Sequence, residues 1–252
     1  MASTDFAENR RRMVDRDIAG RGISDAEVLA AMAKVPREAF ESLGYNVETH
    51  GQKSYNGVAL LSKFPLSDIR RGLPGDDADE QARYLEAVIE APRPIRVAAI
   101  YLPNGNPIGT EKFAYKLAWF ERLNAHARAL LAHEEPLALC GDYNVIPEAE
   151  DARNPAAWVN DALFQPESRR AFRALKNLGL ADAHELGGEP AGTFTFWDYQ
   201  AGAWNRDDGI RIDHMLLTPQ AADLLSDCRI DKQVRAGDKP SDHVPIWIEL
   251  DA

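Results

Sequence analysis

Leu137-Ala-Leu-Cys-Gly-Asp-Tyr-Asn144 is the stretch that decides how this sequence folds. A run of apolar residues predicts a buried strand that ends at Gly141, and Asp142 and Asn144 follow at a spacing of two. In an extended chain this spacing places both side chains on one face. A carboxylate and an amide on one face can hold a water, a metal ion or a phosphate oxygen. The alternative is an Asx turn that only ends the strand, and this motif alone leaves both interpretations open.

Short strands and helices surround this stretch from residue 43 onward. The pattern predicts strands at Tyr45–Thr49, Val58–Ser62, Leu85–Ile89, Ile95–Tyr101, Leu137–Cys140, Thr193–Phe196, Asp213–Leu217 and Ile246–Leu250. It predicts helices at Lys112–Ala132 and Ser168–Leu178, and single turns or short helices at about Ala156–Leu163 and Pro219–Leu225. Short strands separated by polar turns favour two packed sheets flanked by helices.

The first 40 residues have a different character. Their apolar residues recur at helical spacing, and Ser24 with Glu27 forms a capping box. We expect helices at about 5–19 and 25–34. Residues 1–40 are therefore interpreted as a helical N-terminal segment, and residues 41–252 as the main domain.

Composition narrows the class of protein. A chain of 252 residues with 45% hydrophobic and 27% charged residues is typical of a globular α/β protein. The net charge of −11 argues against a nucleic-acid coat protein but leaves room for an enzyme with a local basic groove. Two cysteines suggest a reducing, cytoplasmic compartment. The chain lacks a signal peptide and any apolar run of about 18 residues, so no membrane association is expected.

Further acidic residues and a histidine lie near the C-terminus. Asp242 and His243 adjoin the last predicted strand, and Asp213 lies in an apolar run. Burying a carboxylate costs several kcal/mol unless it is paired. We therefore expect the ring N–H of His243 to point at Asp213. The alternative is a surface acid on an edge strand.

Two more motifs carry groups suited to phosphate or to an unstacked sugar. Tyr101-Leu-Pro-Asn-Gly105 ends a strand with a phenol and an amide, and Lys112 and Lys116 share one helix face. The lysines fit either a contact with a phosphate backbone or a solvated helix. The aromatic cluster Thr193-Phe-Thr-Phe-Trp-Asp-Tyr199 fits either a pocket wall or the core.

Together these residues resemble a known family, exodeoxyribonuclease III and the AP endonucleases. The resemblance follows the family's order through residues 41–252. It rests on Leu43-Gly-Tyr45, His50-Gly-Gln-Lys-Ser-Tyr-Asn-Gly-Val58, Arg71-Gly72, Tyr101-Leu-Pro-Asn-Gly105, Gly141-Asp-Tyr-Asn144, Thr195-Phe-Trp-Asp-Tyr199, Arg211-Ile-Asp213 and Ser241-Asp-His243.

This resemblance implies a four-layer α/β-sandwich of the endonuclease/exonuclease/phosphatase type. It implies a DNA-repair phosphodiesterase of base excision repair, which cleaves 5′ to abasic sites and removes nucleotides in the 3′→5′ direction. The implied cofactor is Mg²⁺ or Mn²⁺, and the implied partner is double-stranded DNA with abasic sites or 3′ ends, bound by a monomer. The reaction is in-line displacement at phosphorus, with the metal neutralising the developing charge.

The resemblance also implies a role for each matching residue. The catalytic residues are Tyr101, Asp142, Asn144, Asp213 and His243. Asp142 activates the attacking water and Asn144 orients it, while His243, held by Asp213, polarises the phosphate. Asp242 lies at the metal site. The substrate-binding residues are Asn104, Lys112 and Lys116, which contact phosphate, and Phe196, Trp197 and Ile212, which form the pocket for the abasic sugar.

The N-terminus departs from that family. The family's Asn-x-Asn strand and its Leu-Gln-Glu-Thr motif, whose glutamate binds the metal, do not occur in residues 1–42. Residues 13–37 instead resemble the helical N-terminus of protein-L-isoaspartate O-methyltransferase, which indicates a fusion near residue 40. The sandwich then lacks its N-terminal strands, and Glu38, Glu41 and Glu48 are the nearest substitute ligands. We therefore expect reduced or absent nuclease activity.

Three functional classes remain open on this evidence. The first is the DNA-repair nuclease, active or impaired. The second is a methyltransferase by N-terminal resemblance only, although that family's glycine-rich methyl-donor site is absent from the rest of the chain. The third is a non-catalytic module that binds abasic DNA through Phe196, Trp197 and Lys116.

Overall fold

The computed structural model of this chain describes residues 40–41, 43–52, 56–188, 190 and 192–251. The helices expected at about 5–19 and 25–34, and almost all of the N-terminal segment, lie outside the described residues. In the described part, no helix is both long and apolar enough to cross a membrane.

A six-stranded mixed sheet forms the centre of the molecule. Its strand order is β3 (Leu66–Arg71), β4 (Tyr84–Ile89), β5 (Ile95–Tyr101), β6 (Leu137–Asp142), β8 (Asp213–Leu217) and β7 (Ala181–Asp182). The strands β5 and β6 are parallel, and the other neighbouring pairs are antiparallel. A parallel pair needs a long crossover connection, which here contains the helix α4 (Glu111–Leu131).

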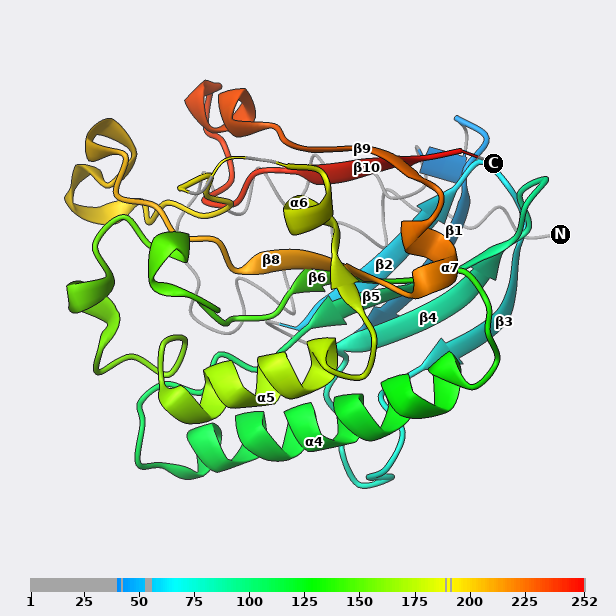
Figure 1. The fold of residues 1–252 in the computed structure, drawn as a ribbon, viewed down its shortest axis with the longest axis horizontal. Coiled ribbons are helices and arrows are strands. Elements are labelled where there is room, and N and C mark those ends of the chain that lie inside the picture. The colour runs from blue at the N-terminus through cyan, green and yellow to red at the C-terminus, as the bar shows by residue number, and fades with distance from the viewer. Residues whose placement is uncertain (1–39, 42, 53–55, 189, 191, 252) are drawn as a thin grey trace, which may run out of the picture.

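Two helices cover one face of this sheet. Figure 1 shows α4 and α5 (Pro166–Lys176) lying side by side below the strands. Their buried residues Trp119, Phe120 and Phe172 pack against Leu139 and Leu216 of the central strands. Burying each large side chain contributes about 1.5–3 kcal/mol, so this helix–sheet layer is the main hydrophobic core.

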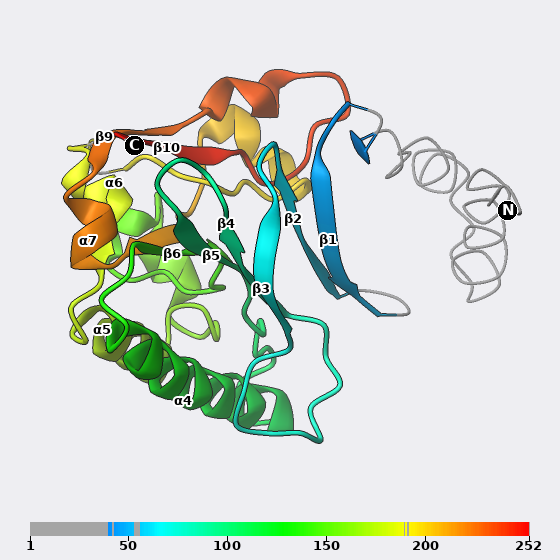
Figure 2. The same ribbon diagram turned by 90° about the vertical axis from the view of Figure 1, so that its right-hand side faces the viewer.

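Two separate ribbons cover the other face. One pairs β1 (Asn46–Gly51) with β2 (Gly57–Ser62), and the other pairs β9 (Leu225–Ile230) with β10 (Ile246–Leu250). Figure 2 shows them on the side of the sheet opposite α4. Within the described residues these ribbons do not pair with each other. The described residues of this layer therefore form two separate two-stranded ribbons.

Short elements connect the layers. The helices α6 (Ala183–Leu186) and α7 (Pro219–Ala222) pack beside β8. Single 3-10 turns are η3 (Ala149–Asp151), η4 (Pro155–Trp158), η5 (Gln200–Gly202), η6 (Trp204–Arg206) and η7 (Lys232–Ala236).

Some predicted elements need correction. Thr193–Phe196 is not a strand, because only Phe196 forms isolated bridges, to Ile210 and His243. The single turn or short helix expected at about Ala156–Leu163 is the 3-10 turn η4, and beyond it the Asp161 carboxylate accepts the backbone N–H of Leu163. The strands β3, β7 and β9 were not predicted. β7 has only two residues, and β3 and β9 carry charged residues without regular apolar alternation.

A buried ion network supports the strand that carries Asp213. The guanidinium of Arg211, which is 3% exposed, donates to Asp151 and to Asp182 at 2.7 Å each. Burial raises the pKa of Asp182, but the hydrogen bond from His214 and the charge of Arg211 outweigh it and hold the pKa well below its usual range. Three segments far apart in the chain therefore meet at Arg211.

We expect Arg211→Met to lower the free energy of unfolding by about 3–5 kcal/mol, because two buried carboxylates lose their partner. Urea denaturation followed by tryptophan fluorescence measures this change. Arg170→Met, which removes an exposed i,i+3 pair with Glu167, is the control and should cost under about 1 kcal/mol. Equal costs for the two variants would contradict the prediction.

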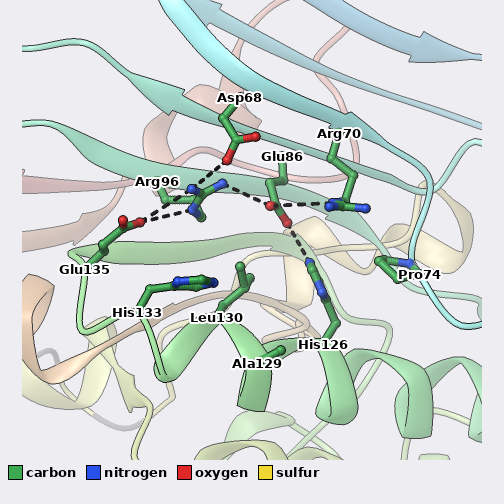
Figure 3. Close-up of a pocket in the computed structure, with 10 residues that line it drawn as sticks. All are labelled: Asp68, Arg70, Pro74, Glu86, Arg96, His126, Ala129, Leu130, His133 and Glu135. Carbon is green, nitrogen blue, oxygen red and sulfur yellow. Dashed lines mark hydrogen bonds and ion pairs between the residues drawn. The ribbon is translucent and has the colours of Figure 1, made fainter.

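A second charged network lines a cavity of about 420 Å³ between the C-terminal half of α4 and the strands β3, β4 and β5. Figure 3 shows Glu86 between His126, Arg70 and Arg96, while Arg96 also reaches Asp68 and Glu135. These charges largely neutralise one another. Arg96 lies next to the first residue of β5 and Tyr101 is the last, so the cavity lies near the opposite end of this strand from Tyr101. We assign it a stabilising role.

Candidate active site

Three polar residues form a row across adjacent strands. Tyr101 at the end of β5 is opposite Asp142 at the end of β6, and Asp142 is opposite Asp213 at the start of β8. Paired residues on neighbouring strands have Cβ atoms about 5 Å apart. Strand register thus brings together residues that are distant in the sequence.

Glycine makes this end of β6 possible. Gly141 has φ +144°, and a Cβ at this position would lie 2.0 Å from the carbonyl oxygen of Ile100. No larger residue fits there without moving the backbone. Gly141 therefore allows Asp142 to sit directly beside β5.

Hydrogen bonds hold Asn144 against Asp142. The backbone N–H of Asn144 donates to Asp142 Oδ1 at 2.8 Å, and its Nδ2 donates to Asp142 Oδ2 at 3.0 Å. Asn104 Nδ2 in turn donates to Asn144 Oδ1 at 2.9 Å. Asn144 has φ +46°, which asparagine tolerates better than most residues. The Asx turn is present, and a further hydrogen bond joins the Asn144 side-chain amide to the Asp142 carboxylate.

The predicted pairing of His243 with Asp213 is confirmed. His243 Nδ1 lies 2.8 Å from Asp213 Oδ2. The hydroxyl oxygen of Thr195 accepts the backbone N–H groups of Ile212 and Asp213, at 3.1 and 3.2 Å. Thr195 therefore holds the backbone that positions this carboxylate.

Asp142 and His243 both have shifted pKa values. Burial and the neighbouring Asp213 carboxylate raise the pKa of Asp142 to about 7. Burial lowers the pKa of His243, but its hydrogen bond to Asp213 and that residue's charge outweigh burial and raise the pKa to about 9. Between these values the site holds a carboxylate and an imidazolium together, which is the pair needed for a base and a phosphate-stabilising cation.

Asp242 is the one predicted metal ligand. It is half-buried, and the hydroxyl of Ser241 lies 3.4 Å from its Oδ1. In the described part of the chain, no group of three His, Cys, Asp or Glu side chains is placed to hold a metal ion. Of the substitute ligands considered, Glu48 pairs with Arg71, Glu41 is exposed, and Glu38 lies outside the described residues. The described residues therefore do not form a complete metal site.

The two lysines of α4 differ in exposure. Lys112 is exposed and accessible to a phosphate, whereas Lys116 is 0% exposed. The ammonium of Lys116 donates to the carbonyl oxygens of Asn104 and Asn144. Burial lowers the pKa of Lys116 to about 7, against the opposing charges of Asp142 and Asp161. The prediction that Lys116 contacts DNA is wrong for this structure, because its side chain has no exposed surface.

The aromatic cluster is mostly core. Trp197 is 0% exposed, packs against Phe194 and Trp204, and donates its indole N–H to Asp207. Ile212 is 3% exposed. Neither side chain has the exposed surface needed to line a pocket for the abasic sugar in this structure, which corrects the prediction that Trp197 and Ile212 form this pocket. Phe196 is partly exposed, and its ring lies 5.0 Å from the His243 ring, so it does border the site.

Arg83 is a neighbour of the site that the sequence did not predict. The guanidinium of Arg83 lies 4.8 Å from the centre of the Tyr101 ring and donates to the Tyr101 carbonyl oxygen. Arg83 precedes β4, and no motif marks it. Only the antiparallel register of β4 and β5 places it there, next to the phenol.

Comparisons with known proteins identify the family of this chain. Residues 21–243 match the model of the "Endonuclease/Exonuclease/phosphatase family". The chain is 34% identical over 233 residues to exodeoxyribonuclease III of Haemophilus influenzae, covering 89% of this chain and 87% of that protein. The similar solved structures include two with about one third sequence identity. One is an AP endonuclease from Archaeoglobus fulgidus (TM-score 0.80, 35% identity, 87% of this chain and 84% of that one). The other is the 3′ phosphatase NExo from Neisseria bound to a product DNA hairpin (TM-score 0.81, 34% identity, the same coverage).

Proposed function

Since this chain belongs to the endonuclease/exonuclease/phosphatase family, we propose that it acts on double-stranded DNA, 5′ to abasic sites and at 3′ ends. Like its homologues, this chain is a DNA-repair nuclease that hydrolyses phosphodiester bonds. The single observation that supports the substrate site is the row of Tyr101, Asp142 and Asp213, with His243 paired to Asp213.

The proposed reaction divides its tasks between these groups. A water oxygen attacks phosphorus, and Asp142 accepts the proton that this water loses. The bond from phosphorus to the 3′ oxygen of the preceding nucleotide breaks, and this oxygen takes up a proton from solvent and leaves as a 3′ hydroxyl. His243 donates a hydrogen bond to a phosphate oxygen as negative charge develops there, while Asn144 orients the water. Tyr101 and Asn104 hold the phosphate, and Lys112 and Phe196 contact the rest of the substrate.

The direct test is cleavage of a fluorescent duplex with one central abasic site, beside a recessed 3′ end and an undamaged blunt duplex. We expect a single incision 5′ to the abasic site and stepwise shortening from the 3′ end. Binding of abasic DNA without cleavage at any metal concentration would support the non-catalytic module instead.

The family is metal-dependent, and we propose Mg²⁺ or Mn²⁺ as the metal, because hard divalent ions prefer carboxylate oxygens. Such an ion would supply charge neutralisation at the phosphate. Asp242 is its proposed ligand. Because the described residues do not complete a three-ligand group, we propose that the metal binds weakly and that activity is reduced accordingly.

We therefore expect EDTA to abolish cleavage. We also expect the Mg²⁺ concentration that gives half-maximal activity to be on the order of 1 mM, as for metal sites with few protein ligands. Asp242→Asn should raise that concentration about tenfold or more. Initial rates across a metal titration measure both effects. Half-saturation at micromolar Mg²⁺ would mean that a full set of ligands exists, and the proposed impairment would be wrong.

A further inference from the structure

Lys116 is a buried lysine that contacts two residues of the site. Its side chain is 0% exposed, and its ammonium lies 3.0 Å from the carbonyl oxygen of Asn104 and also donates to that of Asn144. No carboxylate forms an ion pair with it among the described residues. Burying an ammonium without a counter-ion is costly, so this placement needs a compensating contact, and the two carbonyl groups provide one.

Those two carbonyl groups belong to the residues that adjoin Asp142. Asn104 follows β5 and Asn144 follows β6, and their side chains are hydrogen-bonded to each other. Asn144 also donates to Asp142 and to the carbonyl oxygen of Leu102. Asn144 thus links the two groups, because its carbonyl oxygen accepts from Lys116 while its side-chain amide donates to the Asp142 carboxylate.

Gly105 fits this loop onto the lysine. It has φ +89°, and a Cβ there would lie 2.6 Å from Lys116 Cδ and 3.3 Å from Ala162 Cβ. In the same loop, Asn106 Nδ2 donates to Asp161 Oδ1 at 3.0 Å. The loop therefore packs against the lysine stem and is also held by a polar contact.

We propose that Lys116 is a positioning residue for the nuclease reaction. It ties the loop of Asn104 to the loop of Asn144, and through Asn144 it orients Asp142, without touching the DNA. This inference rests on the proposed function and adds to it a residue that acts from inside the fold.

Lys116→Met keeps most of the side-chain volume and removes the ammonium. We expect kcat on abasic duplex to fall about 10–100-fold, the usual effect of losing a group that orients a catalytic one, with KM changed less than about threefold. Lys112→Met, an exposed change on the same helix, should do the opposite and raise KM with kcat kept. Arg128→Met, also exposed on α4, is the neutral control.

Gly105→Ala tests the same contact without removing the charge. Because its Cβ would displace the Lys116 stem, we expect a similar fall in kcat. Both changes break one contact, so the double variant should lose no more than the worse single variant. Multiplied losses in the double variant would show that the two residues act separately and would overturn the proposal.

A measurement without DNA separates this inference from the proposed function. In ¹⁵N spectra, the side-chain amide signals of Asn104 and Asn144 should move in Lys116→Met and stay in Arg128→Met, even if the parent protein cleaves nothing. If the parent is inactive, the proposed function fails and these signals alone decide on Lys116. Parent-like amide signals, or a parent-like kcat in Lys116→Met, would overturn the positioning role.

Discussion

Replacing Asp142 with asparagine is expected to lower kcat on abasic duplex by about 10²–10⁴-fold, the range for losing a general base. Asparagine matches the carboxylate in size and still offers one oxygen to the backbone N–H of Asn144, so the turn is kept. The group that accepts the water proton is gone. Single-turnover rates of parent and variant measure the loss.

The pH dependence gives a second readout for Asp142. Its pKa is raised to about 7, and only the ionised form accepts a proton, so parent kcat/KM should rise as pH increases through about 7. Residual activity of Asp142→Asn should lack this acidic limb. Asp223→Asn, an exposed change far along the chain, is the control. A loss under tenfold, or an unchanged acidic limb, would remove Asp142 from the role of base.

Replacing His243 with asparagine is expected to lower kcat by about 10²–10³-fold, as for removal of one preorganised donor to a developing oxyanion. The hydrogen bond and charge of Asp213 raise the pKa of His243 to about 9 against the effect of burial. Parent activity should therefore fall as pH increases through about 9, where the imidazolium loses its proton.

Asp213→Asn separates the histidine from the charge that raises its pKa. Asp213 makes the largest contribution that raises this pKa, so the pKa should fall in Asp213→Asn and the alkaline limb should move to lower pH. An NMR titration of the His243 ring in both proteins gives the same comparison without DNA. An alkaline limb that stays in place in Asp213→Asn would show that His243 is not the titrating group.

Local patterns predicted much of the framework. The strands β5, β8 and β10 have the bounds that their apolar patterns predicted. The pairing of His243 with Asp213 followed from a general cost, since an acid in an apolar strand needs a partner. In both cases the information lies in a short run of residues and in a rule that holds in any fold.

The solvent exposure of individual side chains could not be predicted from local sequence patterns. Lys112 and Lys116 share a helix face by spacing, yet only Lys112 reaches solvent. Trp197 looked as available as Phe196, but the loop carrying Trp204 covers it. A side chain is covered by residues from another segment of the chain, and a local sequence pattern contains no information about that segment.

The sequence by itself determined the family, the acid, amide and imidazole groups at the strand ends, and the absence of the family's metal-binding glutamate motif from residues 1–42. These depend on residue identity and short-range spacing. Only the tertiary structure decided that Tyr101, Asp142 and Asp213 form one row, that Lys116 is buried against the carbonyl oxygens of Asn104 and Asn144, and that Trp197 belongs to the core. The reason is physical: register, burial and the shifted pKa values of Asp142 and His243 arise from contacts between segments that are far apart along the chain.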